Sequence, residues 1–201
     1  MVKQVNQVKQ YGFYIDESLC SGCKACAMAC MDKNNLDDGR MFRNVHEFVN
    51  GGVFEDGGPF MQNVGAYWVS LSCNHCARPK CVQGCPTKAM NKDENGIVSV
   101  NQKRCVGCKY CVWNCPYHAP KYDESRGKMS KCDFCKDLLA KGEEPACVAA
   151  CPLGLIHFGP IERLREQYGG NADLAGLPAS TVTGPNLVIK PHKNALRKTG
   201  V

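Results

Sequence analysis

The stretch CVGCKYCVWNCP, residues 105–116, decides the fold. Its four cysteines follow the spacing C-x2-C-x2-C-x3-C with a proline directly after the last one, a run that ligates iron–sulfur clusters. A loop of this pitch wraps three corners of a cubane while its amide N–H groups point at the sulfurs. The fourth corner comes from elsewhere, because the last cysteine of such a run ligates the other cluster of a two-cluster protein.

The sixteen cysteines of this 201-residue chain form four groups of four. The groups are Cys20, Cys23, Cys26 and Cys30; Cys73, Cys76, Cys81 and Cys85; Cys105, Cys108, Cys111 and Cys115; and Cys132, Cys135, Cys147 and Cys151. Groups one and three share the spacing above, whereas groups two and four widen the gap before the third cysteine. Each group supplies four thiolates, so the sequence predicts four [4Fe–4S] clusters.

An internal repeat indicates how the groups are arranged. FYIDESLCSGCKAC at 13–26 parallels VSVNQKRCVGCKYC at 98–111, and each reads as a short strand running into a cysteine loop. Groups two and three are close in sequence, with the strand-like GIVSV at 96–100 between them, so they predict a compact two-cluster module. Groups one and four must then form a second module, whose halves are split around the first.

We therefore predict an α+β fold of two nested bacterial-ferredoxin-like 2[4Fe–4S] modules. Residues 1–39 and 123–160 make the outer module, and 73–122 make the inner one. The partial alternation of apolar and polar residues in AYWVSLS, together with paired glycines as turn signals, predicts a β-hairpin-type insertion over 40–72. Residues 161–201 are predicted as a short helix, bounded by proline and glycine, and an extended docking tail that lies across another surface.

Prolines mark the ends of three cysteine groups. Pro86, Pro116 and Pro152 directly follow the last cysteine of groups two, three and four. Proline starts a helix without wasting an amide donor. Cys30 is followed by Met31 instead, so we expect a different local turn there.

Composition excludes several functions. The formal charge is +6, but the basic residues are scattered and form no stripe for nucleic acid. Four oxidised clusters with their thiolates contribute about −8, so the basic residues compensate for cluster charge. The polar N-terminus and the lack of a long apolar stretch predict a polypeptide that is soluble by itself. A dinucleotide fingerprint, a nucleophile elbow and a phosphate loop are all missing, so we expect no catalysis by this chain alone.

Zinc and disulfides are the competing uses of so many cysteines. Structural zinc takes two C-x2-C pairs, and the triplet of group three does not divide into pairs. Of the four groups, group four has the longest gap, and it is the group that best fits a zinc site or a site without a cluster. Disulfides require an oxidising compartment, which this chain has no signal of its own to enter.

Three residues are candidates for tuning a cluster without binding it. His75 lies inside group two, which already has four thiolates, so donation to a sulfur or carbonyl is favoured over ligation. Lys24 and Lys109 occupy matching places in the repeat and are candidates for raising cluster potentials. The alternative for each lysine is a solvated side chain on a loop.

The chain resembles the iron–sulfur subunits of bacterial dimethyl sulfoxide reductases, within the molybdopterin oxidoreductase family. The resemblance covers about residues 10–193 and rests on QYGFYIDESLCSGCKAC, SLSCNHC, CVGCKYC with CPYHAPKYD, MSKCDFC and PNLVIKP. It implies a non-catalytic electron-transfer subunit in anaerobic respiration. The implied partners are a quinol-oxidising integral membrane anchor subunit and a molybdopterin catalytic subunit that reduces dimethyl sulfoxide or a similar acceptor.

The resemblance also implies which cysteines share a cluster. The four sets are Cys20, Cys23, Cys26 and Cys151; Cys30, Cys132, Cys135 and Cys147; Cys73, Cys76, Cys81 and Cys115; and Cys85, Cys105, Cys108 and Cys111. By the same analogy the first set lies nearer the molybdenum subunit and the third nearer the membrane. In nitrate reductase relatives the position of Cys108 is a tryptophan beside a three-iron cluster, so cysteine here implies four cubanes.

The implied location is the cell membrane, reached peripherally through the anchor subunit. Export with the catalytic partner favours the periplasmic face, and the cytoplasmic face is the alternative. The rival function is a stand-alone polyferredoxin or a cluster-assembly protein. The insertion and the apolar tail at 187–191 argue against that rival, because both look like interface elements.

Overall fold

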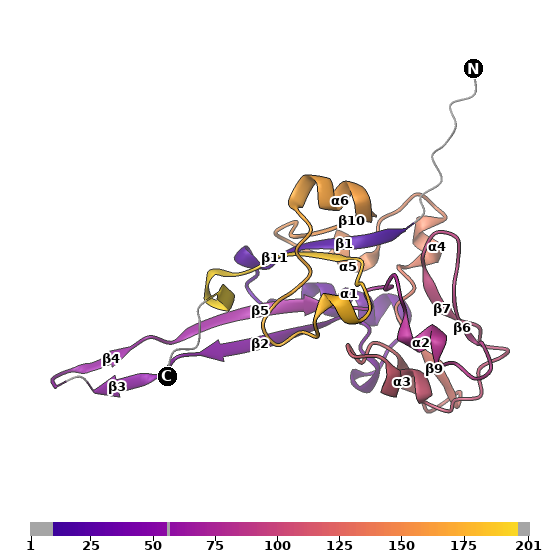
Figure 1. Cartoon of the computed structure of the whole chain (residues 1–201), viewed down its shortest axis with the longest axis horizontal. Helices are drawn as coiled ribbons and strands as arrows, with labels where there is room; N and C mark the ends of the chain where they lie inside the picture. Colours follow the sequence, from indigo (N-terminus) through magenta and orange to yellow (C-terminus); the bar gives the residue numbers. More distant parts are fainter. Residues whose placement is uncertain (1–9, 56, 197–201) are drawn as a thin grey trace, which may run out of the picture.

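The computed structural model describes residues 10–55 and 57–196. Figure 1 shows a body of short helices and strands from which one long two-stranded arm extends. The parts of the predicted outer module and tail that fall on residues 1–9 and 197–201 lie outside the described residues.

The outer module is built from the two ends of the chain. Strand β1 (Tyr11–Asp16) pairs antiparallel with β10 (Ile156–Pro160), with Phe13 opposite Phe158. Helix α1 (Ala25–Asn34) packs against α5 (Ala146–Ala149), so groups one and four meet as predicted. The remaining short helices are α4 (Lys136–Leu139) and α6 (Ile161–Tyr168), and α6 packs on β1 and β10.

The inner module repeats this plan with shorter elements. Strands β6 (Met90–Lys92) and β7 (Val98–Val100) pair antiparallel, and α2 (Lys80–Gln83) packs against α3 (Tyr110–Asn114). A hairpin of β8 (Lys121–Asp123) and β9 (Lys128–Ser130) leads back to the outer module. The nested two-module prediction is confirmed.

The residue after the last cysteine sets the length of the repeated helix. In α3, Pro116 pushes Cys115 out of the helical region, to φ −93° and ψ 111°, and the helix ends at Asn114. In α1, Met31 imposes no such restriction, and the helix continues through Cys30 to Asn34. The expected difference at Cys30 is therefore a longer helix.

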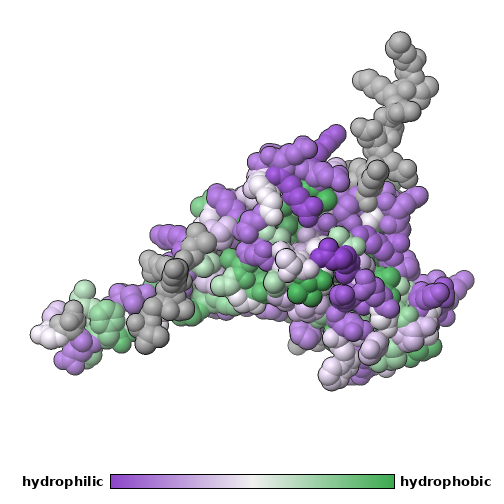
Figure 2. Space-filling view, viewed as in Figure 1, coloured by the Kyte–Doolittle hydropathy of each residue, from purple (hydrophilic) through white to green (hydrophobic). Residues whose placement is uncertain are grey.

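The insertion is a long hairpin with a buried base and an exposed tip. Strand β2 (Asn44–Asn50) pairs along its whole length with β5 (Gly65–Leu71), and β3 (Val53–Glu55) pairs with β4 (Phe60–Gln62) at the tip. Val45, Tyr67 and Val69 enter the core. All described residues of β3 and β4 are exposed, and Figure 2 shows apolar side chains along this arm. The hairpin prediction is confirmed.

The apolar tail corrects an expectation. Strand β11 (Leu187–Lys190) pairs parallel with β1, with Ile189 opposite Ile15, and completes a three-stranded sheet. Leu187, Val188 and Ile189 are almost fully buried in this chain's own core. The segment Leu187–Lys190 therefore docks on β1, and its three buried apolar side chains are not free to contact another subunit.

Short 3-10 helices connect these elements at Glu17–Leu19, Asp38–Arg40, Ser180–Val182 and Lys193–Leu196. Within residues 10–55 and 57–196, no helix has the length and apolar character needed to cross a membrane.

Candidate cluster sites

Four cavities in the structure are each lined by four cysteines, and we number them as sites. Site 1 is lined by Cys20, Cys23, Cys26 and Cys151; site 2 by Cys30, Cys132, Cys135 and Cys147; site 3 by Cys73, Cys76, Cys81 and Cys115; and site 4 by Cys85, Cys105, Cys108 and Cys111. All sixteen cysteines are free of disulfides. Every site draws three cysteines from one group and the last cysteine of another.

Left-handed backbone shapes the loops of groups one and three. Gly22 and Gly107, equivalent in the repeat, have φ of 70° and 69°. A Cβ at Gly22 would lie 2.4 Å from the Trp68 ring, and one at Gly107 would lie 2.2 Å from the carbonyl oxygen of Gly127. Both positions require glycine because side chains are disfavoured at positive φ and there is no room for one.

Amide groups already point at the cysteine sulfurs. The N–H groups of Met90 and Met129 donate to Cys85 Sγ and Cys105 Sγ, each at 3.4 Å, and Leu155 N–H donates to Cys151 Sγ at 3.3 Å. Such donors stabilise the negative charge that a thiolate carries when it binds iron. The donor set therefore fits an iron–sulfur cluster chemically.

The buried thiols favour their neutral form in the absence of metal. Burial, together with the neighbouring Cys147, raises the pKa of Cys30 to about 12. Burial and the neighbouring Cys73 raise the pKa of Cys81 to about 12 as well. Positive iron at these sites would replace the protons and satisfy the thiolates.

The four sites form one series. Helix α1 links sites 1 and 2 through Cys26 and Cys30. Cys132 of site 2 packs against Cys73 and Cys115 of site 3. Helix α3 and the cysteine after it link sites 3 and 4 through Cys111 and Cys115. Site 3 is therefore internal and site 4 lies at the end of the series. This order differs from the implied one, in which the third set, which lines site 3, lies nearer the membrane.

Each end of the series has an exposed cysteine beside exposed apolar side chains. Cys23 of site 1 and Cys108 of site 4 are the two exposed cysteines. Leu19, Met28 and Leu153 are exposed on the segments around Cys23, and Val106, Tyr110 and Trp113 on those around Cys108. Trp113 is 83% exposed, an unusual position for the largest apolar side chain.

His75 lies between sites 2 and 3. Its Nδ1 accepts the Val98 N–H at 2.9 Å, and its ring stacks 3.6 Å from that of Phe134, which lines site 2. Its Nε2 is buried and has no hydrogen-bond partner among the described residues. His75 also lines site 3, so its Nε2–H is available to a sulfur there, and donation to a cluster stays a prediction.

Lys24 and Lys109 share a backbone conformation, and their exposure favours the alternative of a solvated side chain on a loop. Their φ values are 61° and 60°, and both side chains are exposed. Lys109 Nζ lies over the Tyr122 ring, 3.9 Å from its centroid. Their match in the repeat thus follows from the turn that begins α1 and α3.

Two buried cations were missed by the sequence analysis. Arg43 lines site 2 and is 1% exposed, and Lys131 lines site 3 and is 6% exposed. The ammonium group of Lys131 donates to the carbonyl oxygens of Val98 and Cys132. Lys131 directly precedes Cys132, which is a weak sequence signal that it lies near a cluster. Nothing near Arg43 in the sequence points to a cluster.

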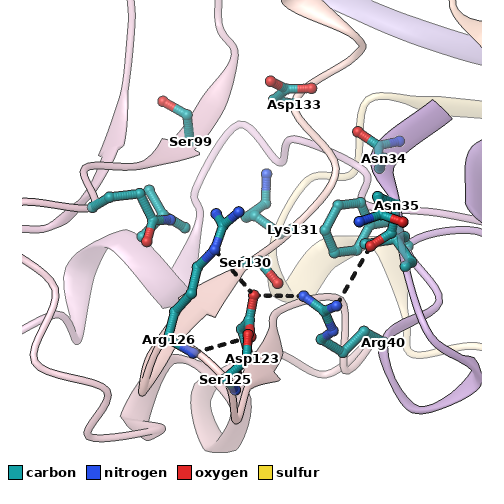
Figure 3. Close-up of a pocket in the computed structure, with 14 residues that line it drawn as sticks. Asn34, Asn35, Arg40, Ser99, Asp123, Ser125, Arg126, Ser130, Lys131 and Asp133 are labelled. Carbon is teal, nitrogen blue, oxygen red and sulfur yellow. Dashed lines mark hydrogen bonds and ion pairs between the residues drawn. The ribbon is translucent and has the colours of Figure 1, made fainter.

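A polar cleft that is not a cluster site is larger than any of the four cysteine-lined cavities. Its volume is about 420 Å³, and it lies between the end of α1 and the β8–β9 hairpin. Figure 3 shows the Asp123 carboxylate between Arg40 and Arg126, with Arg40 Nη1 at 2.5 Å. Hydrogen bonding from Ser125, with smaller contributions from both arginines, lowers the pKa of Asp123. This ion pair ties the segment before β2 to the β8–β9 hairpin.

Comparison with known proteins agrees with this geometry. A family model described as a 4Fe-4S dicluster domain matches residues 64–161, and a 4Fe-4S binding domain matches residues 13–30. The B subunit of anaerobic dimethyl sulfoxide reductase from Escherichia coli is 49% identical over 191 residues, covering 95% of this chain and 93% of the relative.

More distant relatives are named for other acceptors. The B subunit of polysulfide reductase from Wolinella succinogenes is 41% identical and covers 92% of this chain and 96% of its own length. The electron transfer subunit of thiosulfate reductase from Salmonella typhi is 40% identical, covering 76% of this chain and 77% of its own length. With these matches and sixteen cysteines lining four sites, the chain belongs to the family of electron-transferring iron–sulfur subunits that includes the B subunit of anaerobic dimethyl sulfoxide reductase.

Proposed function

We propose that this chain passes electrons through four [4Fe–4S] clusters, one at each site, between two partner subunits. The ligand sets are the four quartets that line sites 1 to 4. The observation that carries the proposal is the single series of sites with one exposed cysteine at each end. A protein that relays electrons between two partners needs an accessible cluster at each end of its series and clusters shielded from solvent between them.

The proposed donor is a quinol-oxidising membrane anchor subunit, which delivers electrons at site 4. Site 4 replaces site 3, which the resemblance placed nearer the membrane, because site 4 ends the series and carries the exposed Cys108. The proposed acceptor is a molybdopterin catalytic subunit, which receives them at site 1 and reduces dimethyl sulfoxide or a similar compound. This direction rests on the family resemblance, which assigns the outer module to the molybdenum side. The complex then holds this chain on the membrane, at the periplasmic face if it is exported with the catalytic subunit and otherwise at the cytoplasmic face.

Exposed apolar surface supports a subunit over a stand-alone polyferredoxin. The arm presents Val49, Val53, Phe54, Phe60, Met61 and Val64 to solvent. A two-stranded hairpin is marginal in water by itself, and an extended exposed apolar surface marks an interaction site. A stand-alone carrier would gain nothing from such an arm, whereas a subunit covers it with a partner.

We expect anaerobically purified protein to contain about sixteen iron atoms per chain and no stoichiometric zinc, because each quartet completes a cubane. Metal analysis with acid-labile sulfide measures this directly. Group four is the sharpest internal test, since its long gap separates Cys135 from Cys147. About eight irons with two zincs would contradict the four-cluster proposal.

We expect Trp113→Ser to weaken docking at the site 4 end. An exposed aromatic side chain at an interface commonly contributes about 2 kcal/mol or more, which is on the order of thirtyfold in affinity. Turnover supported by quinol should fall in the assembled complex, while turnover with a small soluble donor that feeds the catalytic subunit directly is retained. Leu153→Ser, at the site 1 end, is the matched control and should weaken association with the catalytic subunit instead. Unchanged quinol-supported turnover of the Trp113→Ser complex would show that the surface around Trp113 does not contact the donor subunit.

A further inference from the structure

Arg43 is a buried cation without an acidic partner. Its side chain is 1% exposed, and no carboxylate of the described residues lies within 4 Å of its guanidinium group. Burying an unpaired charge is costly, and arginine does not escape by losing its proton. A compensating negative charge must therefore be present in the working protein.

Neutral groups hold the guanidinium in one place. Nη1 donates to Ser70 Oγ at 2.9 Å, and Nη2 donates to Ser72 Oγ at 3.0 Å. Its carbon atom Cζ lies over the Phe13 ring, 4.7 Å from the centroid. These contacts orient the cation but supply no net charge to balance it.

The cysteines closest to Arg43 belong to sites 1 and 2. Arg43 itself lines site 2, beside Cys30 and Cys147. Ser70, which accepts from Arg43, has its Oγ 3.4 Å from Cys26 Sγ of site 1. Burial lowers the pKa of Arg43, but the negative charge that Cys147, Cys26 and Cys132 carry when ionised outweighs it and leaves the pKa raised.

Glu17 does not take this role. It is fully buried, accepts the Ser70 N–H at 3.0 Å through Oε1, and has no partner for Oε2 among the described residues. Its carboxyl group is not within 4 Å of the Arg43 guanidinium group, so the two form no ion pair, and burial raises the pKa of Glu17 to about 8. Clusters bound at sites 1 and 2 would then supply the negative charge nearest to Arg43.

We propose that Arg43 is a built-in counter-cation shared by the clusters of sites 1 and 2 and that it raises their reduction potentials. The inference rests on the proposed function. One-electron reduction takes a cluster with four thiolates from about −2 to about −3. A fixed cation nearby stabilises the more negative state more strongly, and little solvent screens it at this depth. Arg43 thus favours electron arrival at the molybdenum end of the series, as a positioning residue that binds neither iron nor substrate.

The test is a redox titration of the purified complex followed by electron paramagnetic resonance. Arg43→Gln removes the charge and keeps hydrogen-bonding capacity toward Ser70 and Ser72. We expect the clusters of sites 1 and 2 to become about tenfold harder to reduce, which is about 59 mV for a one-electron couple. Arg43→Lys, which keeps the charge, should restore most of that shift, and sites 3 and 4 should be unaffected in both variants.

Lys109→Gln is the matched control for the loss of a cation. Lys109 belongs to the loop of site 4, but its side chain is exposed, so solvent and salt screen it and its loss should move no potential appreciably. Unshifted potentials at sites 1 and 2 in Arg43→Gln would overturn the inference. Iron analysis of the unaltered complex comes first, and fewer than four clusters there would count against the proposed function instead.

A second measurement does not depend on a variant that folds. In the unaltered protein with ¹⁵N-labelled arginine, the reduced clusters of sites 1 and 2 should show hyperfine coupling to guanidinium nitrogen. Of the described arginines, Arg43 alone lines either site. The lack of such coupling would equally overturn the inference.

Discussion

Removal of iron is expected to unfold most of this chain. The cysteines are part of the core: Cys26 and Cys147 belong to the largest buried cluster of side chains, and Cys81 and Cys111 to the core of the inner module. Without iron these positions are thiols around cavities, with fewer apolar contacts than a packed core provides. Structural metal sites contribute on the order of 10 kcal/mol to folding, comparable to the whole stability of a small domain.

The secondary structure gives little independent support. Helices α2, α4 and α5 have four residues each, far below the length at which a helix is stable by itself. The ladders β6–β7 and β8–β9 have three residues on each strand. These elements persist because the cysteine loops on either side are joined through a common site.

Far-ultraviolet circular dichroism of protein treated anaerobically with a chelator measures this loss. Most of the helical and strand signal should disappear, and addition of iron and sulfide under reducing conditions should restore it. The three-stranded sheet of β1, β10 and β11 is the part with an apolar core of its own, so any residual signal should come from there. A native spectrum in iron-free protein would mean that side-chain packing alone holds the modules.

The sequence predicted the modules well because their determinants are local. The cysteine spacings, the strand before each loop and the prolines after Cys85, Cys115 and Cys151 act within a few residues. The helix 161–168 was likewise marked by its own Pro160 and Gly169, whose φ is 86°. The cavity quartets match the ligand sets that the resemblance implied, and their occupancy stays a prediction.

Long-range features escaped the sequence analysis for a physical reason. The apolar run of β11 shows that the segment is buried, but its pairing with β1 joins residues far apart in the chain. Arg43 is fixed by Ser70, Ser72 and Phe13, which come from separate segments and form no motif. Lys24 and Lys109 were candidates because they occupy matching positions in the repeat. What the two positions share in the structure is a left-handed backbone conformation.

Replacing Cys108 is expected to convert one cubane into a three-iron cluster. Cys108 is the exposed corner of site 4, so Cys108→Ser removes a ligand without disturbing packed side chains. Cys85, Cys105 and Cys111 remain to hold the other irons. The altered cluster should have a different, higher potential, because the number of irons and the thiolate environment set the redox poise.

The matched control is Cys111→Ser at the same site. Cys111 is 6% exposed and belongs to the core with Met90 and Val98. Its loss should therefore destabilise the whole inner module and lower the iron content by more than one atom. Comparing the two variants separates the removal of a ligand from the disruption of a core.

The consequence for electron flow follows from the place of site 4 at the end of the series. Because electrons from quinol would have to pass the altered cluster, quinol-supported turnover of the Cys108→Ser complex should fall at least tenfold. A small soluble donor that feeds the catalytic subunit directly should still support turnover. Electron paramagnetic resonance of the oxidised variant is the decisive measurement, since an oxidised three-iron cluster is paramagnetic and an oxidised [4Fe–4S] cluster is silent. Four intact cubanes in that variant would show that Cys108 is not a ligand and that Cys85, Cys105 and Cys111 do not form a site with it.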